Sequence, residues 1–157
     1  MTEPSLRQRA LRHLARRDYS RAELTRKLAP HGEAEEIDAV LDRMSELTLQ
    51  SDARLAKSWV RSHAGRFGRA RLQSELTRRG LARALIEEAL SGDDLASELD
   101  RARALRQTKF PDAPADTRER ARQARFLHAR GFAADIVRAV LAEEPEPESE
   151  PAQGEAS

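Results

Sequence analysis

The chain of 157 residues contains 28 lysines and arginines against 27 acidic residues and has no cysteine, and its formal net charge is +1. Without cysteine it can form neither disulfides nor thiolate metal sites, as is typical of proteins from a reducing compartment. No apolar run resembles a secretory signal or a transmembrane segment, so we expect a cytoplasmic protein that does not contact membranes.

The small net charge conceals an uneven distribution. Six glutamates and no basic residue lie from Glu143 to the last residue, so residues 1–142 hold 21 acidic against 28 basic residues and carry about +7. An acidic, proline-containing segment cannot bury enough apolar surface to offset its ordering entropy. We therefore expect residues 143–157 to be a disordered tail, either a solubilising appendage or a competitor that folds back on the basic body.

Apolar residues elsewhere recur at helical spacing, and nothing alternates with the period of a β-strand, which predicts an all-α fold. The first helix is expected over residues 6–17. Ser20 begins the second, because Glu23 three residues later completes a capping box. This helix ends near Gly32, and a full amphipathic stripe predicts the third over residues 34–46.

The rest of the body shows the same kind of pattern. Ser51 or Asp52 begins the fourth helix, which Gly65 and Gly68 end. Asp93 or Asp94 caps the seventh helix, and Asp116 caps the eighth after a loop that contains two prolines. The fifth to ninth helices are expected over residues 69–79, 81–90, 95–107, 117–129 and 133–142, in that order.

A repeated motif groups these helices in threes. A leucine stands four residues before a glycine three times, and the glycines are separated by 48 and 51 residues. We expect each glycine to supply the left-handed residue that ends a helix. A period of this length is typical of repeat proteins, so we predict three tandem three-helix repeats in an elongated, curved array. The pairs are Leu28 with Gly32, Leu76 with Gly80 and Leu127 with Gly131; another leucine precedes the first two pairs at Leu24 and Leu72, where the third copy has Gln123. The predicted domains are residues 1–49, 50–92 and 93–142, followed by the tail at 143–157.

The residues that commonly carry catalysis are not arranged for it. The four histidines lie in four separate segments without metal-ligand spacing, and the glycine-rich stretch at Gly65 and Gly68 lacks the lysine and serine of a phosphate-binding loop. His63 falls on an apolar helical stripe, where a histidine with satisfied hydrogen bonds is expected rather than a ligand. The sequence therefore predicts a protein without catalytic, metal or cofactor sites.

Basic clusters are the remaining candidates for function. Arginines crowd the first helix and the stretch "RSHAGRFGRARLQSELTRR", which suits an acidic partner or phosphates. Only six aromatic residues are present, and Trp59, Phe126 and Phe132 fall at core-like positions, so base stacking is disfavoured. Two alternatives stay open: a module that coats DNA directly through its basic face, and a helical adaptor with another partner.

Three blocks of the sequence resemble the signature blocks of the RecX family, bacterial regulators of the RecA recombinase. They are "LARRDYSRAELTRKLAPHG", "SDARLAKSWVRSHAGRFGRARLQSELTRRGLARALIEEAL" and "RFLHARGFAADIVRAVL", and the resemblance covers residues 6–141. The chain departs from the family at "LTLQSD", where a glycine-bearing turn and paired aspartates are usual and only Asp52 stands.

The resemblance implies tandem three-helix units that lie in the groove of the RecA–DNA filament and limit its growth or stability. It implies damped strand exchange, ATPase activity and repressor self-cleavage, with no cofactor and no catalysis. We expect a monomer whose partners are the RecA filament and the DNA phosphate backbone. The expected contact residues are basic: Arg66, Arg69, Arg71, Arg78 and Arg79 from the middle repeat, with Arg26 and Lys27 from the first.

Overall fold

The structure is a computed structural model that describes residues 2–93 and 95–143. Over these residues the chain forms nine α-helices, one short 3-10 helix and no β-strand, which confirms the all-α prediction. The predicted tail lies outside the described residues, apart from Glu143. The elements are α1 (Leu6–Arg16), α2 (Arg21–Leu28), η1 (Ala29–His31), α3 (Ala34–Glu46), α4 (Asp52–His63), α5 (Arg69–Arg78), α6 (Arg83–Leu90), α7 (Glu98–Lys109), α8 (Thr117–Ala129) and α9 (Ala134–Ala142).

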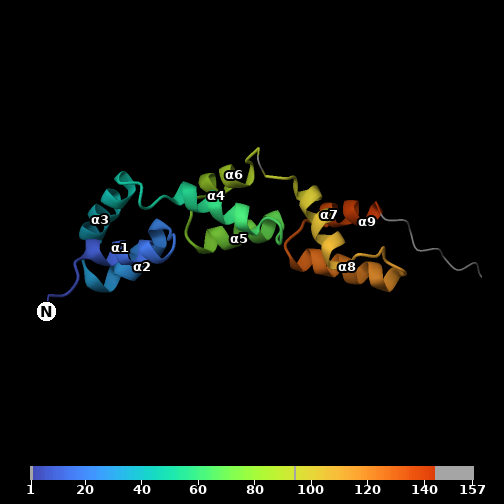
Figure 1. Cartoon of the computed structure of the whole chain (residues 1–157), viewed down its shortest axis with the longest axis horizontal. Helices are drawn as coiled ribbons and strands as arrows, with labels where there is room; N and C mark the ends of the chain where they lie inside the picture. Colours follow the sequence, from blue (N-terminus) through green and yellow to red (C-terminus); the bar gives the residue numbers. More distant parts are fainter. Residues whose placement is uncertain (1, 94, 144–157) are drawn as a thin grey trace, which may run out of the picture. The chain divides into compact units, whose positions relative to one another are not determined.

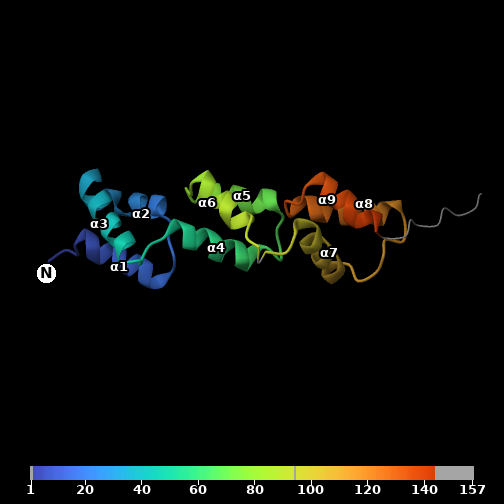
Figure 2. The same ribbon diagram turned by 90° about the horizontal axis from the view of Figure 1, so that it is seen from above.

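The helices are grouped in threes along the chain, as predicted, and the three helices of each group lie side by side in both views (Figures 1 and 2). Helices α1–α3 share one apolar core and α7–α9 another, while α4 packs on α6. The leucine four residues before each repeated glycine is fully buried, at Leu28, Leu76 and Leu127. Short helices are marginally stable alone, so the burial of these apolar faces holds each group together.

The described residues divide into two compact units. Unit 1 comprises the described residues of 1–63 and 72–95, and unit 2 those of 64–71 and 96–157. Residues 64–71, which the sequence analysis placed within the second repeat, therefore belong to the unit that contains α7–α9. The predicted repeat borders at residues 49/50 and 92/93 stay predictions.

Helix caps follow the sequence closely, with one exception. The Ser20 hydroxyl accepts from the Glu23 N–H, and the Glu23 carboxylate accepts from the Ser20 N–H, both at 3.0 Å. Asp116 caps α8 as predicted, accepting from the N–H of Glu119 at 2.7 Å. The expected cap of α7 was wrong: the helix begins three residues later than predicted, because the Ser97 hydroxyl accepts from the Asp100 N–H at 3.1 Å. A serine at the correct spacing therefore competes with the earlier aspartates as a cap.

Two of the three repeated glycines end helices in the left-handed conformation. Gly80 and Gly131 have φ of 83° and 88°, and the next residue donates to the carbonyl of the repeat leucine at 3.2 Å in both cases. Gly32 does not: its φ is −175°, because α2 is first continued by the 3-10 turn η1. A left-handed residue does occur later, after the end of α3, at Thr48 (φ 58°), in the stretch that departs from the family pattern.

Candidate partner-binding surface

Three arginines surround the ring of Phe67 in unit 2. The guanidinium of Arg71 lies 5.0 Å from the ring centroid, and those of Arg66 and Arg130 lie 5.8 Å from it. Arg130 also lies 5.0 Å from the ring of Phe126. Aromatic faces attract guanidinium groups, so the rings orient these cations without neutralising them. We call Arg66, Arg71 and Arg130 the Phe67 cluster.

A close backbone contact holds the two segments of this cluster together. The N–H of Gly68 donates to the Arg130 carbonyl at 2.8 Å, and the N–H of Ala70 donates to the Gly131 carbonyl at 3.3 Å. A Cβ on Gly68 would lie 2.4–2.5 Å from backbone atoms of Gly131 and Phe132. Real side chains do not approach a backbone so closely, so this contact requires glycine.

A buried arginine fixes the segment from the other side. The Arg101 guanidinium donates from Nη1 to the carbonyls of Ala64 (2.9 Å) and Phe67 (2.7 Å), and from Nε to the carbonyl of Ala96 (3.1 Å). Burial lowers the pKa of Arg101; the carboxylate of Glu98 opposes this shift. Arginine stays charged even so, and these carbonyls replace water around it.

Four of the predicted contact residues lie in unit 1, and two of these, Arg78 and Arg79, lie at the end of α5 and directly after it. Arg79 pairs with Glu23 at 3.1 Å, and its carbonyl accepts from the Ser20 hydroxyl at 2.6 Å. Burial tends to raise the pKa of Glu23, but the hydrogen bond from the Ser20 N–H and the charge of Arg79 outweigh it and lower this pKa. Arg79 therefore joins α5 to α2 inside unit 1. Arg78 is exposed and pairs along the helix with Glu75 at 3.2 Å.

The other predicted residues are placed as follows. Arg26 and Lys27 are exposed on α2, and the Lys27 ammonium lies 5.5 Å from the ring centroid of Tyr19. Arg69 is half-buried, and its N–H donates to the Glu98 carboxylate at 3.3 Å. The structure thus brings Arg66 and Arg71 together. The sequence analysis missed Arg130, although it stands in the third quoted block, directly before the repeated glycine.

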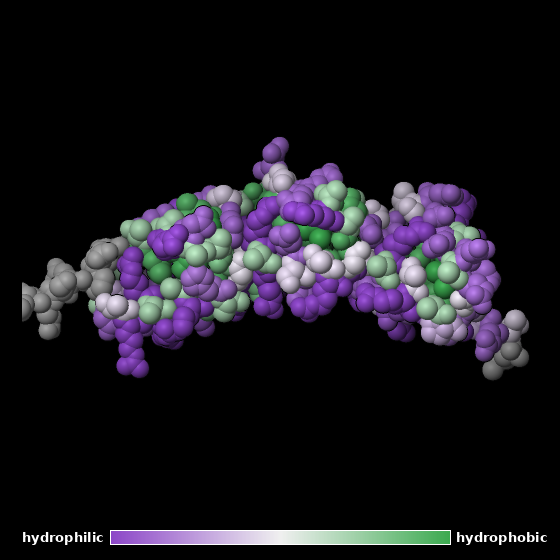
Figure 3. Space-filling view, turned by 180° about the vertical axis from the view of Figure 1, so that it is seen from behind, coloured by the Kyte–Doolittle hydropathy of each residue, from purple (hydrophilic) through white to green (hydrophobic). Residues whose placement is uncertain are grey.

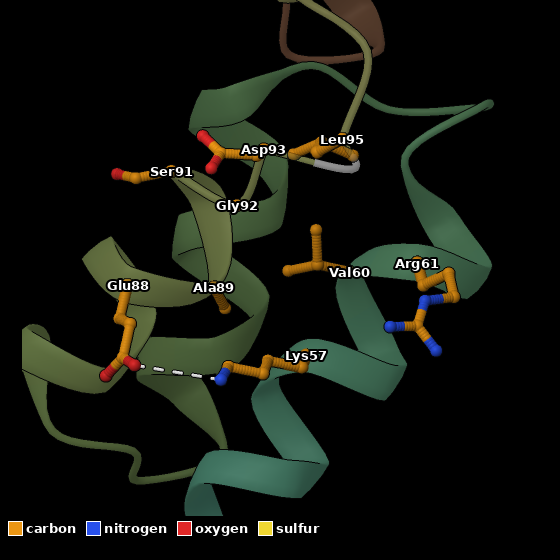
Figure 4. Close-up of a pocket in the computed structure, with 9 residues that line it drawn as sticks. All are labelled: Lys57, Val60, Arg61, Glu88, Ala89, Ser91, Gly92, Asp93 and Leu95. Carbon is orange, nitrogen blue, oxygen red and sulfur yellow. Dashed lines mark ion pairs between the residues drawn. The ribbon is translucent and has the colours of Figure 1, made fainter.

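A cleft of about 650 Å³ lies in unit 1 between α4 and the end of α6 (Figure 4). Its apolar lining includes Val60, Ala89 and Leu95, and Lys57 forms an ion pair with Glu88 at 3.7 Å across one side.

Hydrophilic side chains cover much of the surface displayed in Figure 3, with apolar side chains in separate patches.

Over residues 2–93 and 95–143, no three or more histidines, aspartates or glutamates are grouped as metal ligands. In the same ranges, no helix has the length and apolar content that a bilayer crossing requires. His63 is half-buried as expected: its ring stacks on Trp59 at 4.0 Å, and its Nδ1 lies 2.8 Å from the Trp59 carbonyl oxygen.

Comparison with known proteins identifies the family. The three domains that define RecX match in order: the first three-helix domain over residues 7–44, the second over 51–90 and the third over 96–141. The chain belongs to the RecX family. Proteins named "Regulatory protein RecX" are similar along most of their length, which supports a regulatory role. That of Leptothrix cholodnii is 50% identical over 139 residues (87% of each chain), and that of Chromobacterium violaceum is 48% identical over 140 residues (88% of this chain and 90% of the relative).

Solved RecX structures have the same fold. The crystal structure of RecX from Lactobacillus salivarius superposes with a TM-score of 0.72 at 22% identity, covering 88% of this chain and 93% of that one. A second crystal structure, of regulatory protein RecX, gives a TM-score of 0.70 at 18% identity over 86% of this chain and 70% of that one. At this level of identity the comparison concerns the fold alone.

Proposed function

We propose that this RecX-family chain is a cytoplasmic, non-catalytic negative modulator of the RecA recombinase. It binds in the groove of the RecA–DNA filament, limits filament growth or stability, and so damps recombination, ATPase activity and repressor self-cleavage. The match of all three RecX domains, in order, is the observation that carries this proposal. The chain acts as a monomer in it, and the linked repeats gain affinity from several weak contacts at once.

The Phe67 cluster is the contact surface that we assign to this function. Its three guanidinium groups lie around the Phe67 ring, and that of Arg130 also lies near the Phe126 ring. Contact with an aromatic ring leaves a guanidinium charged, and arginine is enriched at binding surfaces. Arg69 and Arg78, with Arg26 and Lys27, are proposed as supporting contacts, whereas Arg79 is engaged by Glu23.

The test is the ATPase activity of RecA on single-stranded DNA with increasing amounts of this chain. We expect the wild-type chain to lower the activity. A variant with Arg66→Gln, Arg71→Gln and Arg130→Gln should require at least about tenfold more protein for the same inhibition, because three charges that each contribute about 0.5 kcal/mol or more add up to about 1.5 kcal/mol. The control variant carries Arg43→Gln, Arg83→Gln and Arg138→Gln, which lower the net charge equally at exposed positions outside the cluster.

Three outcomes would count against the proposal or a part of it. A folded chain that leaves the ATPase activity of the filament unchanged at every concentration would refute the regulatory role. Equal inhibition by the cluster variant and the control variant would refute the contact surface only. Binding to naked DNA as tight as binding to RecA-coated DNA, with a steep dependence on salt, would favour direct coating of DNA instead.

A further inference from the structure

A turn in unit 1 presents apolar side chains to solvent. Leu47 and Leu49 are 36% and 42% exposed, and they are the two exposed large apolar residues in the part of the chain that the structure describes. They stand on either side of Thr48, whose φ of 58° is left-handed. A left-handed threonine costs stability, and exposed apolar groups favour contact with another apolar surface. We call residues 47–49 the leucine turn.

Hydrogen bonds from both sides hold the leucine turn in this conformation. The N–H of Thr48 donates to the Ser45 carbonyl and that of Leu49 to the Met44 carbonyl, both at 2.9 Å. Arg54 of α4 donates from Nη1 to the Thr48 carbonyl at 2.8 Å and from Nη2 to the Leu49 carbonyl at 3.3 Å. A turn that is already ordered loses little conformational entropy when it binds.

The cleft between α4 and the end of α6 offers an apolar surface that suits these leucines (Figure 4). Val60 of α4 and Ala89 of α6 lie on opposite sides of it, and Leu95 also lines it. Its volume of about 650 Å³ falls in the range of ligand pockets, about 300–1,000 Å³, so leucine side chains fit. Asp93, also in the lining, is exposed and forms no ion pair within the described ranges.

Charge and position make the turn and the cleft complementary between copies of the chain. Arg54 stands beside the leucine turn with its side chain 47% exposed, and Asp93 lines the cleft, so a cation accompanies one apolar surface and an anion the other. The leucine turn precedes the first residue of α4, whereas Val60 lies in the last turn of that helix. Neither leucine lines the cleft of its own chain, which leaves both surfaces available to another copy.

We propose that the leucine turn of one copy of this chain docks into the α4–α6 cleft of another copy. The contact joins two different surfaces, so it can link copies head-to-tail in a row. It buries less than the about 1,200 Å² of a stable complex, so we expect a dissociation constant of about 1 mM and a monomer at micromolar concentration. Copies that bind one filament meet at a higher effective concentration; this consequence rests on the proposed function, whereas the contact itself does not.

The experiment follows the methyl signals of the full chain by NMR at increasing protein concentration, without RecA. We expect the signals of Leu47, Leu49 and Val60 to shift together, with a midpoint at about 1 mM. A cleft variant with Asp93→Arg and Leu95→Ser should reduce the shifts of both leucines about fivefold at equal concentration, because it removes one charge pair and part of the apolar lining. These two changes lie outside the leucine turn.

A charge control and a mixing experiment separate docking from a loss of folding. Asp112→Arg changes the net charge equally at an exposed position of unit 2 and should leave the shifts as in the wild type. A turn variant carries Leu47→Ser and Leu49→Ser and keeps its cleft, whereas the cleft variant keeps its turn. Adding unlabelled turn variant to isotope-labelled cleft variant should restore the shifts of Leu47 and Leu49, because each variant supplies the surface that the other lacks.

Three outcomes of the NMR experiment would overturn the proposal: shifts that do not change with concentration, shifts that persist in the cleft variant, and a mixture that restores nothing. On RecA filaments, the wild-type chain should inhibit the ATPase with a steeper concentration curve than independent binding gives, and the turn variant should lose this steepness. Weaker inhibition by the turn variant at unchanged steepness would assign the leucine turn to the filament and overturn the contact between copies. A wild-type chain that does not inhibit, but shows the NMR shifts, would count against the proposed function alone.

Discussion

Replacing Gly68 by alanine tests the backbone contact that positions the Phe67 cluster. The added methyl would lie 2.4–2.5 Å from three backbone atoms of Gly131 and Phe132, which cannot rotate away as a side chain could. Separating the segments strains or breaks the hydrogen bonds from Gly68 and Ala70. Overpacking costs about 1–3 kcal/mol and each of the two hydrogen bonds, if lost, about 0.5–1.5 kcal/mol, so we expect a loss of about 2–6 kcal/mol.

Gly65 provides the matched control, because a Cβ there meets nothing within 4 Å and its φ is not positive. Gly65→Ala should change stability by less than about 0.5 kcal/mol. The assay is urea unfolding followed by circular dichroism, comparing midpoints at equal m-values. If two unfolding transitions appear, Gly68→Ala should lower the midpoint of the transition that unfolds unit 2. Equal midpoints for the two alanine variants would refute the close approach.

Three further predictions concern other positions. Gln123→Leu should stabilise unit 2 by about 1–2 kcal/mol in the same assay, because its buried Oε1 has no hydrogen-bond partner among the described residues; a destabilised variant would show that this oxygen is satisfied. Thr48→Gly should stabilise unit 1 by about 0.5–1 kcal/mol by relieving a left-handed threonine, and an unchanged melting temperature would contradict that. The lowered pKa of Glu23 stabilises the fold above its unfolded pKa, near 4.5, and this gain is lost as the pH falls through the folded value. Glu23→Gln should therefore reduce the change in stability between about pH 6 and about pH 3; an unaltered pH profile would rule out this contribution.

Local sequence patterns predicted much of the fold. Capping boxes and leucine spacing depend on residues within two helical turns, so Ser20 and Asp116 could be assigned as caps from the sequence. The same local rules failed where two signals competed. Ser97 replaced the earlier aspartates as the cap of α7, and the 3-10 turn before Gly32 removed its role as a left-handed stop.

The candidate surface was only partly predictable. Arg66 and Arg71 stand in one basic run, so their closeness followed from the sequence. Their partner Arg130 lies 64 residues beyond Arg66, and its guanidinium is 3.5 Å from the Arg66 carbonyl oxygen. A single sequence gives no signal that two arginines so far apart in the chain, among 28 basic residues, are neighbours in the fold.

The sequence by itself determined that the chain is helical, that it repeats, and which family it resembles, because helix period, caps and repeat spacing are local properties. Only the tertiary structure decided which charges stay available to a partner. In the folded chain Arg79 pairs with Glu23, Arg101 is buried against three carbonyls, and other cations lie around the rings of Phe67 and Tyr19. The physical reason is that the effect of a charge depends on its distance to other charges and to water, and packing between distant segments sets both.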